Sequence, residues 1–170
     1  MTSKSLTLLS GAFCLSLVLS ACNPAALAEL PGIVTQLLTD KNTVESFVQD
    51  LKKNVDSNTK GYSSVERKYE DARAAYDGYL DAVKLAVLNN QPKTNLAFLT
   101  ENVRTKTARF LAEATKDLAP TVDTRGVQFE KAINPPTSLH TQICKLPKQY
   151  RATALQQLED QLRWKSWDQF

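Results

Sequence analysis

His140 and Cys144 are the two side chains of this sequence best suited to catalytic or metal chemistry. His140 is the single histidine of the chain, and Cys144 follows it by four residues. In a helix this spacing would place an imidazole base or ligand beside a thiol. Pro135, Pro136 and Pro147 surround the segment, and two ligands do not complete a metal site. We therefore predict neither a catalytic nor a metal-binding role for the pair.

Carboxylates offer a second kind of chemistry, that of the paired acids of a hydrolase. Glu66, Glu70 and Asp71, and further along Asp77 and Asp81, alternate with lysines and arginines. Charges mixed in this way at helical spacing are typical of a solvated, salt-bridged face. The sequence has neither clustered glycines for a phosphate loop nor a haem-attachment motif. We expect no enzymatic activity and no cofactor.

Aromatic residues form two candidate interaction surfaces. Tyr62, Tyr69 and Tyr76 recur every seven residues, and a stiff ring with a polar tip suits contact with a ligand or partner. Heptad spacing favours the alternative that this stripe is core. Trp164 and Trp167 lie among basic residues near the C-terminus, a mixture suited to a membrane interface or to docking. The alternative there is that the tryptophans fold back over neighbouring helices.

The first residues of the chain predict export. Lys4 is followed by a run from Leu6 to Leu19 that is almost entirely apolar, and the next charge is Glu29. This layout is typical of a secretory signal peptide. An uncleaved membrane-spanning helix is the alternative, but Pro24 interrupts the run early for a span of roughly 20 residues.

The end of the apolar run predicts how the signal is processed. Leu19, Ser20, Ala21 and Cys22 resemble the lipobox of bacterial lipoproteins, in which the cysteine receives diacylglycerol. The resemblance implies cleavage before Cys22, lipidation of Cys22 with acyl chains such as palmitate, and stable anchoring to a membrane. Because Asn23 follows the cysteine, it also implies sorting to the outer membrane, facing the periplasm. The competing interpretation is an ordinary cleavage site at the triplet Ala26-Leu27-Ala28.

Composition limits what the mature chain does. Without residues 1–21 it keeps 20 basic and 18 acidic side chains, interspersed along 149 residues, so we expect no nucleic-acid partner. That length suits one domain with its own core. Cys144 is the remaining thiol, either in an intermolecular bridge or as a small buried residue.

A heptad pattern predicts the main helix. Asn42 with Glu45 has the form of a capping box at its start. Apolar and tyrosine residues, with Asn58 as the one exception, then alternate steps of four and three: Val44, Val48, Leu51, Val55, Asn58, Tyr62, Val65, Tyr69, Ala72, Tyr76, Tyr79, Val83 and Ala86.

Weak helix formers cluster within this pattern from Asp56 to Gly61. Gly61 could end one helix, and Ser63 with Glu66 could cap a new one. Since the register passes through the stretch without a skip, we expect one long helix that is bent there.

Two further helices are expected to cover the first. Asn89 to Lys93 predicts a tight connection, after which Leu96 to Leu118 can return antiparallel along Val65 to Ala86. The other half, Val44 to Val65, is expected to pack against a C-terminal helix from about Pro147 to Trp167.

The sequence therefore predicts an all-α fold, a long antiparallel helical hairpin or small helical bundle with coiled-coil-like heptad packing. Short helices are expected at Pro31–Thr39 and Val127–Ile133. The expected organisation is a signal peptide at 1–21, a lipidated tether at 22–30 and one helical domain at 31–170. Heptad spacing leaves open whether the seam pairs within one chain or in a homo-oligomer.

The expected function is that of a lipid-anchored helical protein of the bacterial cell envelope. It would act by protein-protein contact as a scaffold, adaptor or assembly subunit, with the membrane and an envelope protein as partners. One alternative is a small-ligand binding or sensing module whose pocket is lined by Tyr62, Tyr69 or Tyr76. Another is a protective lipoprotein with an immunity, exclusion or lysis-associated role.

Overall fold

The computed structural model describes residues 24–89, 94–118 and 138–170, with the backbone alone at 24–31, 94 and 117. These residues form five α-helices and no strand, which confirms the all-α prediction. The helices are α1 (Pro24–Asn54), α2 (Tyr62–Asn89), α3 (Thr94–Asp117), α5 (Leu139–Lys145) and α6 (Lys148–Leu162), and a short 3₁₀ helix, η1, spans Trp167–Gln169. The signal peptide, Cys22 and the helix expected at Val127–Ile133 lie outside the described residues.

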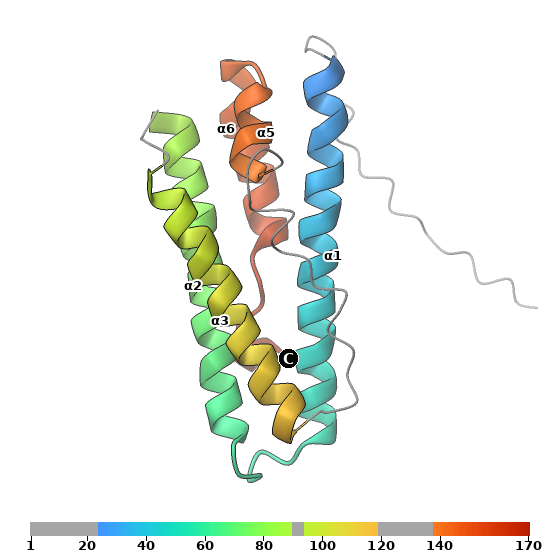
Figure 1. Cartoon of the computed structure of the whole chain (residues 1–170). Helices are drawn as coiled ribbons and strands as arrows, with labels where there is room; N and C mark the ends of the chain where they lie inside the picture. Colours follow the sequence, from blue (N-terminus) through green and yellow to red (C-terminus); the bar gives the residue numbers. More distant parts are fainter. Residues whose placement is uncertain (1–23, 90–93, 119–137) are drawn as a thin grey trace, which may run out of the picture.

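The helices form an elongated bundle (Figure 1). α1 and α2 run antiparallel along its length, and α3 turns back along α2. α5 and α6 lie between α1 and α2 at the end where α1 begins and α2 ends, which we call the upper end. The chain then runs from α6 toward the opposite, lower end, so that the C-terminus lies between α1 and α2.

The prediction of one long helix through Asn58 to Gly61 is wrong. α1 ends at Asn54, and the chain reverses before α2 begins at Tyr62. The Asp56 carboxylate accepts a 2.9 Å hydrogen bond from the Asn58 amide, a local turn that competes with helix. Gly61 has a φ of +94°, in the left-handed region that glycine adopts at little cost. Local turn chemistry therefore overrides the heptad register.

The expected start of the main helix at Asn42 is also wrong, because α1 begins at Pro24. Asn42 lies in the middle of α1 and is exposed. Glu45, instead of capping a helix start, accepts a 2.9 Å hydrogen bond from the Lys165 amide, 120 residues away. Residues 24–30, which the sequence assigned to a tether, are helical.

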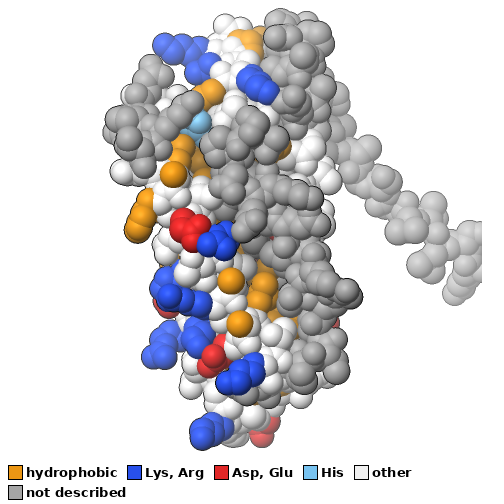
Figure 2. Space-filling model, in the orientation of Figure 1, with side chains coloured by type: hydrophobic (Ala, Val, Ile, Leu, Met, Phe, Trp, Pro, Cys, Tyr) orange, Lys and Arg blue, Asp and Glu red, His pale blue; other side chains and the backbone are white. Residues whose placement is uncertain are grey.

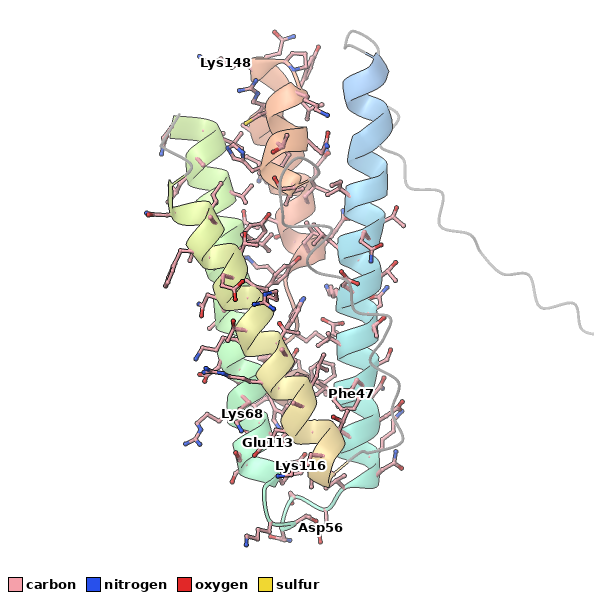
Figure 3. The ribbon with its side chains drawn as sticks, in the orientation of Figure 1. Phe47, Asp56, Lys68, Glu113, Lys116 and Lys148 are labelled. Atoms are coloured by element: carbon pink, nitrogen blue, oxygen red, sulfur yellow. The ribbon has the colours of Figure 1, made fainter. Side chains whose placement is uncertain are left out.

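The antiparallel return of the second helix along Val65 to Ala86 is confirmed. Lys68 on α2 lies 2.8 Å from Glu113 near the end of α3 (Figure 3), and Asp71 lies 3.5 Å from Lys106, about two turns earlier on α3. As the residue number rises on one helix it falls on the other. The α3 side chains that face α2 include the buried Val103, Phe110 and Ala114.

The expected position of the C-terminal helix requires a correction. α6 ends at Leu162, short of Trp167, and it packs at the upper end, where Glu159 lies 2.7 Å from Lys84 of α2. The stretch from Val44 to Val65 is divided between α1 and α2. It is covered by α3, where Phe110 packs against Phe47, and by the residues after α6, where Trp167 packs against Tyr62. These residues are non-helical at 163–166 and form η1 at Trp167–Gln169.

Candidate functional site

The five aromatic residues singled out from the sequence lie together inside the bundle. We call Tyr62, Tyr69, Tyr76, Trp164 and Trp167 the aromatic cluster; none is more than 7% exposed. They therefore belong to the core, as the alternative interpretation held, and do not present an exposed surface.

Ring geometry shows how the aromatic cluster is built. The Trp164 indole stacks on Tyr76 with ring centroids 5.0 Å apart and on Tyr69 at 6.1 Å. Trp167 meets Tyr62 edge to face with centroids 5.5 Å apart, and it lies tilted against Tyr69 at 5.7 Å. Stacked and edge-to-face pairs at these distances are the favourable arrangements of aromatic quadrupoles. The tyrosines at heptad positions of α2 thus contact two tryptophans that lie about a hundred residues further along the chain.

Hydrogen bonds fix the backbone of residues 163–170, which we call the C-terminal segment. The Tyr69 hydroxyl donates to the Lys165 carbonyl at 2.7 Å, and the Trp167 amide donates to the Glu70 carboxylate at 2.6 Å. On the other side, the Lys52 ammonium donates to the Trp167 carbonyl at 2.8 Å. The C-terminal segment is therefore bonded to both α1 and α2.

Burial changes the acidity of the tyrosines on α2. It raises the pKa of Tyr76 and Tyr79 well above the usual 10.0, and it does the same for Tyr69, with a further contribution from Glu45. The pKa of Tyr62 is also raised, by burial and then by Glu66. Desolvation disfavours a phenolate, so these rings stay neutral and act as apolar bodies with one donor each.

The tyrosines proposed to line a ligand pocket, Tyr62, Tyr69 and Tyr76, are at most 7% exposed. The tyrosine rings pack against one another and against the two tryptophans. A small hollow between α2 and α6 has room for about 20 Å³, the space of about one water molecule. Its lining residues are Leu80, Val83, Lys84, Leu139, Leu155, Leu158, Glu159 and Leu162.

Arg163 accounts for several of the carboxylates considered above. Its guanidinium lies 2.7 Å from Glu159, 3.2 Å from Asp77 and 2.5 Å from Asp81. Hydrogen bonds from Arg163 and then from Lys84 lower the pKa of Glu159, whereas burial raises the pKa of Asp77 despite the nearby guanidinium. These charges join the end of α6 to α2 and are arranged as a structural network.

The His140 and Cys144 pair does come together, because α5 is helical despite the neighbouring prolines. Ser138 caps α5 by accepting a 3.3 Å hydrogen bond from the Thr141 amide, and the Cys144 sulfur lies 3.6 Å from His140 Nε2. Among the described residues, no group of three or more histidine, cysteine, aspartate or glutamate side chains could hold a metal ion.

Three apolar residues near the end of α2 and the start of α3 are exposed, and the sequence did not single them out. Leu85 and Leu88, 48% and 46% exposed, lie in the last five residues of α2, and Phe98, 73% exposed, is the fifth residue of α3. We call these three residues the apolar tip. All three fall outside the heptad register, and apolar residues off the register are the signal that could have revealed them.

Charge is unevenly distributed along the bundle. In Figure 2 the described surface at the upper end shows hydrophobic and basic side chains, and acidic ones begin further down. The sequence agrees, since residues 82–89, 94–100 and 138–158 contain no aspartate or glutamate. The basic residues there include Lys145 and Lys148, both exposed.

Comparisons with known proteins leave the bundle without an assigned relative. No protein-family model, no curated protein and no solved structure matches the chain. None of the described helices is both long enough and apolar enough to cross a membrane.

Proposed function

We propose that this chain is a lipid-anchored helical protein of the bacterial cell envelope that works by protein-protein contact, as a scaffold, adaptor or assembly subunit. The observation that carries the proposal is the sequence Leu19-Ser20-Ala21-Cys22 directly after an apolar run. Diacylglycerol on Cys22, with a further acyl chain, anchors a protein firmly because each buried methylene adds about 0.8 kcal/mol. By the resemblance to enteric lipoproteins, Asn23 favours the outer membrane, facing the periplasm.

The architecture of the bundle supports a role in contact. α1 has 31 residues and is therefore about 45 Å long. The C-terminal segment bonds α1 to α2 through Lys52, Tyr69 and Glu70, and it fills the space between them with tryptophan. A closed bundle of this kind presents its long outer faces at a fixed distance from the anchor, which suits a scaffold or adaptor.

Acylation is the first part of the proposal to test. Cells expressing the wild type, Cys22→Ala or Cys144→Ala are fed an alkyne-tagged fatty acid, and label and membrane fraction are measured. We expect label and membrane association for the wild type and Cys144→Ala, and neither for Cys22→Ala. Label that persists in Cys22→Ala would refute the anchor, and Cys144→Ala controls for acylation of the remaining thiol.

Partner capture tests the second part. Crosslinking in intact cells, followed by affinity capture and mass spectrometry, compares the same three chains. We expect one envelope protein to be captured with the wild type and with Cys144→Ala, and to be lost with Cys22→Ala. If the acylated, folded wild type captures nothing specific, the scaffold or adaptor role is wrong even though the anchor stands.

A further inference from the structure

We propose that the upper end of the bundle rests directly on the lipid headgroups, with the apolar tip, Leu85, Leu88 and Phe98, entering the membrane surface and Lys148 facing the phosphates. This inference rests on the lipid anchor proposed above and specifies how the anchored bundle is oriented. It assigns a binding surface to residues that the core does not use, and its partner is the bilayer itself.

The short connection between anchor and bundle leads to this orientation. α1 begins at Pro24, two residues after Cys22. Two residues of fully extended chain span at most about 7 Å. The headgroup layer on each side of the hydrocarbon core is roughly 5–7 Å thick. With the acyl chains of Cys22 in the hydrocarbon, the start of α1 therefore cannot stand clear of the headgroups.

The apolar tip lies at the same end of the bundle as the start of α1. In Figure 1 the end of α2 and the start of α1 are both at the upper end, with α5 and α6 between them, and α3 begins below the end of α2. Leu85 and Leu88 are close to the end of α2, and Phe98 is close to the start of α3. A phenylalanine that is 73% exposed to water gains by moving into an apolar phase. The interface of a bilayer offers such a phase at the place where the anchor holds the bundle.

Charge at the upper end suits phosphate headgroups. Residues 138–158, which form α5 and most of α6, contain Lys145, Lys148 and Arg151 and no acid. Lys148 lies at the tip of the bundle (Figure 3). Arg151 donates hydrogen bonds to the carbonyls of Cys144 and Leu146 and so holds the turn between α5 and α6 in place. Glu29 is the acid in the first turns of α1, and its side chain lies outside the described residues; Glu159 and Asp160 follow this acid-free stretch on α6.

A bilayer fits these observations better than a protein partner does. Anionic lipids attract basic residues that lie within a Debye length of the surface. The two-residue connection holds the start of α1 at the lipid, so the upper end, where α2 also ends, is the end of the bundle that faces the bilayer. This orientation favours the membrane as the occupant.

Fluorescence quenching tests the orientation with the complete, acylated protein. Phe98→Trp places a reporter in the apolar tip, and Asn58→Trp places one in the exposed turn at the lower end, near Asp56 (Figure 3). Each variant is reconstituted in vesicles of phosphatidylethanolamine and phosphatidylglycerol whose acyl chains carry bromine near the headgroup. Emission of the wild type, from the buried Trp164 and Trp167, is subtracted. Mass spectrometry first verifies the acyl group on Cys22.

We expect bromine to quench the Phe98→Trp emission at least twofold more than the Asn58→Trp emission. Equal quenching of the two reporters in acylated protein would overturn the proposed orientation while leaving the anchor intact. A Phe98→Trp emission that is already blue-shifted without vesicles and insensitive to bromine would also overturn it, since another protein surface would then cover the tip. Absence of the acyl group would refute the anchor itself, which distinguishes the two failures.

Discussion

The phenol of Tyr69, in the first half of α2, donates a 2.7 Å hydrogen bond to the carbonyl of Lys165, 96 residues further along the chain. Its ring lies between Phe110 of α3 and the two tryptophans of the C-terminal segment, with centroid distances of 5.3–6.1 Å. One side chain therefore joins three separate parts of the bundle. The C-terminal segment is therefore part of the core of the bundle.

Truncation of Trp167 should destabilise the bundle strongly. Trp167 is 4% exposed and packs against Tyr62 and Tyr69, so Trp167→Ala leaves a cavity and should lower the free energy of unfolding by about 3–5 kcal/mol. Urea unfolding followed by circular dichroism measures the change. Phe98→Ala, at a site that is 73% exposed, is the matched control and should stay within about 0.5 kcal/mol of the wild type. Similar losses for both variants would refute the packing role of Trp167.

Alanine at two glycines should have opposite effects. Gly61 has a φ of +94°, which an alanine adopts only with backbone strain. Gly61→Ala should therefore lower the free energy of unfolding by about 1–2 kcal/mol. The loss comes from the backbone alone, because no neighbour lies within 4 Å of the added methyl group. Gly78 lies inside α2 and also has open space, so Gly78→Ala should stabilise by roughly 0.5–1 kcal/mol. Thermal unfolding of the two variants checks the signs; two shifts in the same direction would contradict the prediction.

The tyrosines of α2 should ionise only when the protein unfolds in alkali. Their pKa in the folded state is raised above the 10.0 of an unfolded chain, mainly by burial, so the folded state holds its protons more tightly. This contribution to stability is complete below pH 10 and is lost as the pH rises further. In a pH titration, phenolate absorbance from these residues should rise together with loss of the helical circular dichroism signal. A rise that clearly precedes unfolding would show that the rings are accessible.

Glu159 should contribute to stability above pH 4.5 and lose that contribution in acid. Hydrogen bonds from Arg163 and Lys84 lower its folded-state pKa below the usual 4.5, so the unfolded chain takes up its proton first as the pH falls. Glu159→Gln should therefore reduce the difference in the free energy of unfolding between pH 7 and pH 3. The reduction should be less than about 1 kcal/mol, because Glu159 and Arg163 are partly solvated. Urea unfolding at both pH values measures this difference.

Asp160→Asn provides the control for that experiment. Asp160 is the exposed neighbour of Glu159 on α6 and makes no ion pair within the described residues. Its variant should keep the pH dependence of the wild type. If it changes the pH dependence as much as Glu159→Gln does, the effect comes from general charge and not from the Arg163 network.

Periodicity predicted the core of the main helices well. Every residue of the heptad register from Val44 to Ala86 is buried except Val55 and Asn58, which lie in the turn between α1 and α2. The register misled at that turn because Val55 and Tyr62 are seven residues apart, so a reversal of the chain left the spacing intact. Gly61 itself was the better indication that the helix ends there, since the structure gives it a positive φ.

Tertiary contacts explain what the sequence did not predict. Glu45 has the spacing of a capping residue, yet its carboxylate bonds the amide of Lys165. No heptad spacing links α2 to Trp164, because residues 163–166 are non-helical and the contact of Trp164 with Tyr76 joins residues far apart in the sequence. The apolar tip was missed because Leu85, Leu88 and Phe98 lie off the register that defined the core.

The long separation between Tyr69 and Lys165 also sets the timing of folding. A chain made from its N-terminus at about 5–20 residues per second needs about 5–20 s to extend from one residue to the other. Throughout that interval α1 and α2 lack the tryptophans that fill the space between them. α1 and α2 therefore cannot close around the complete aromatic cluster before Trp164 and Trp167 have been synthesised.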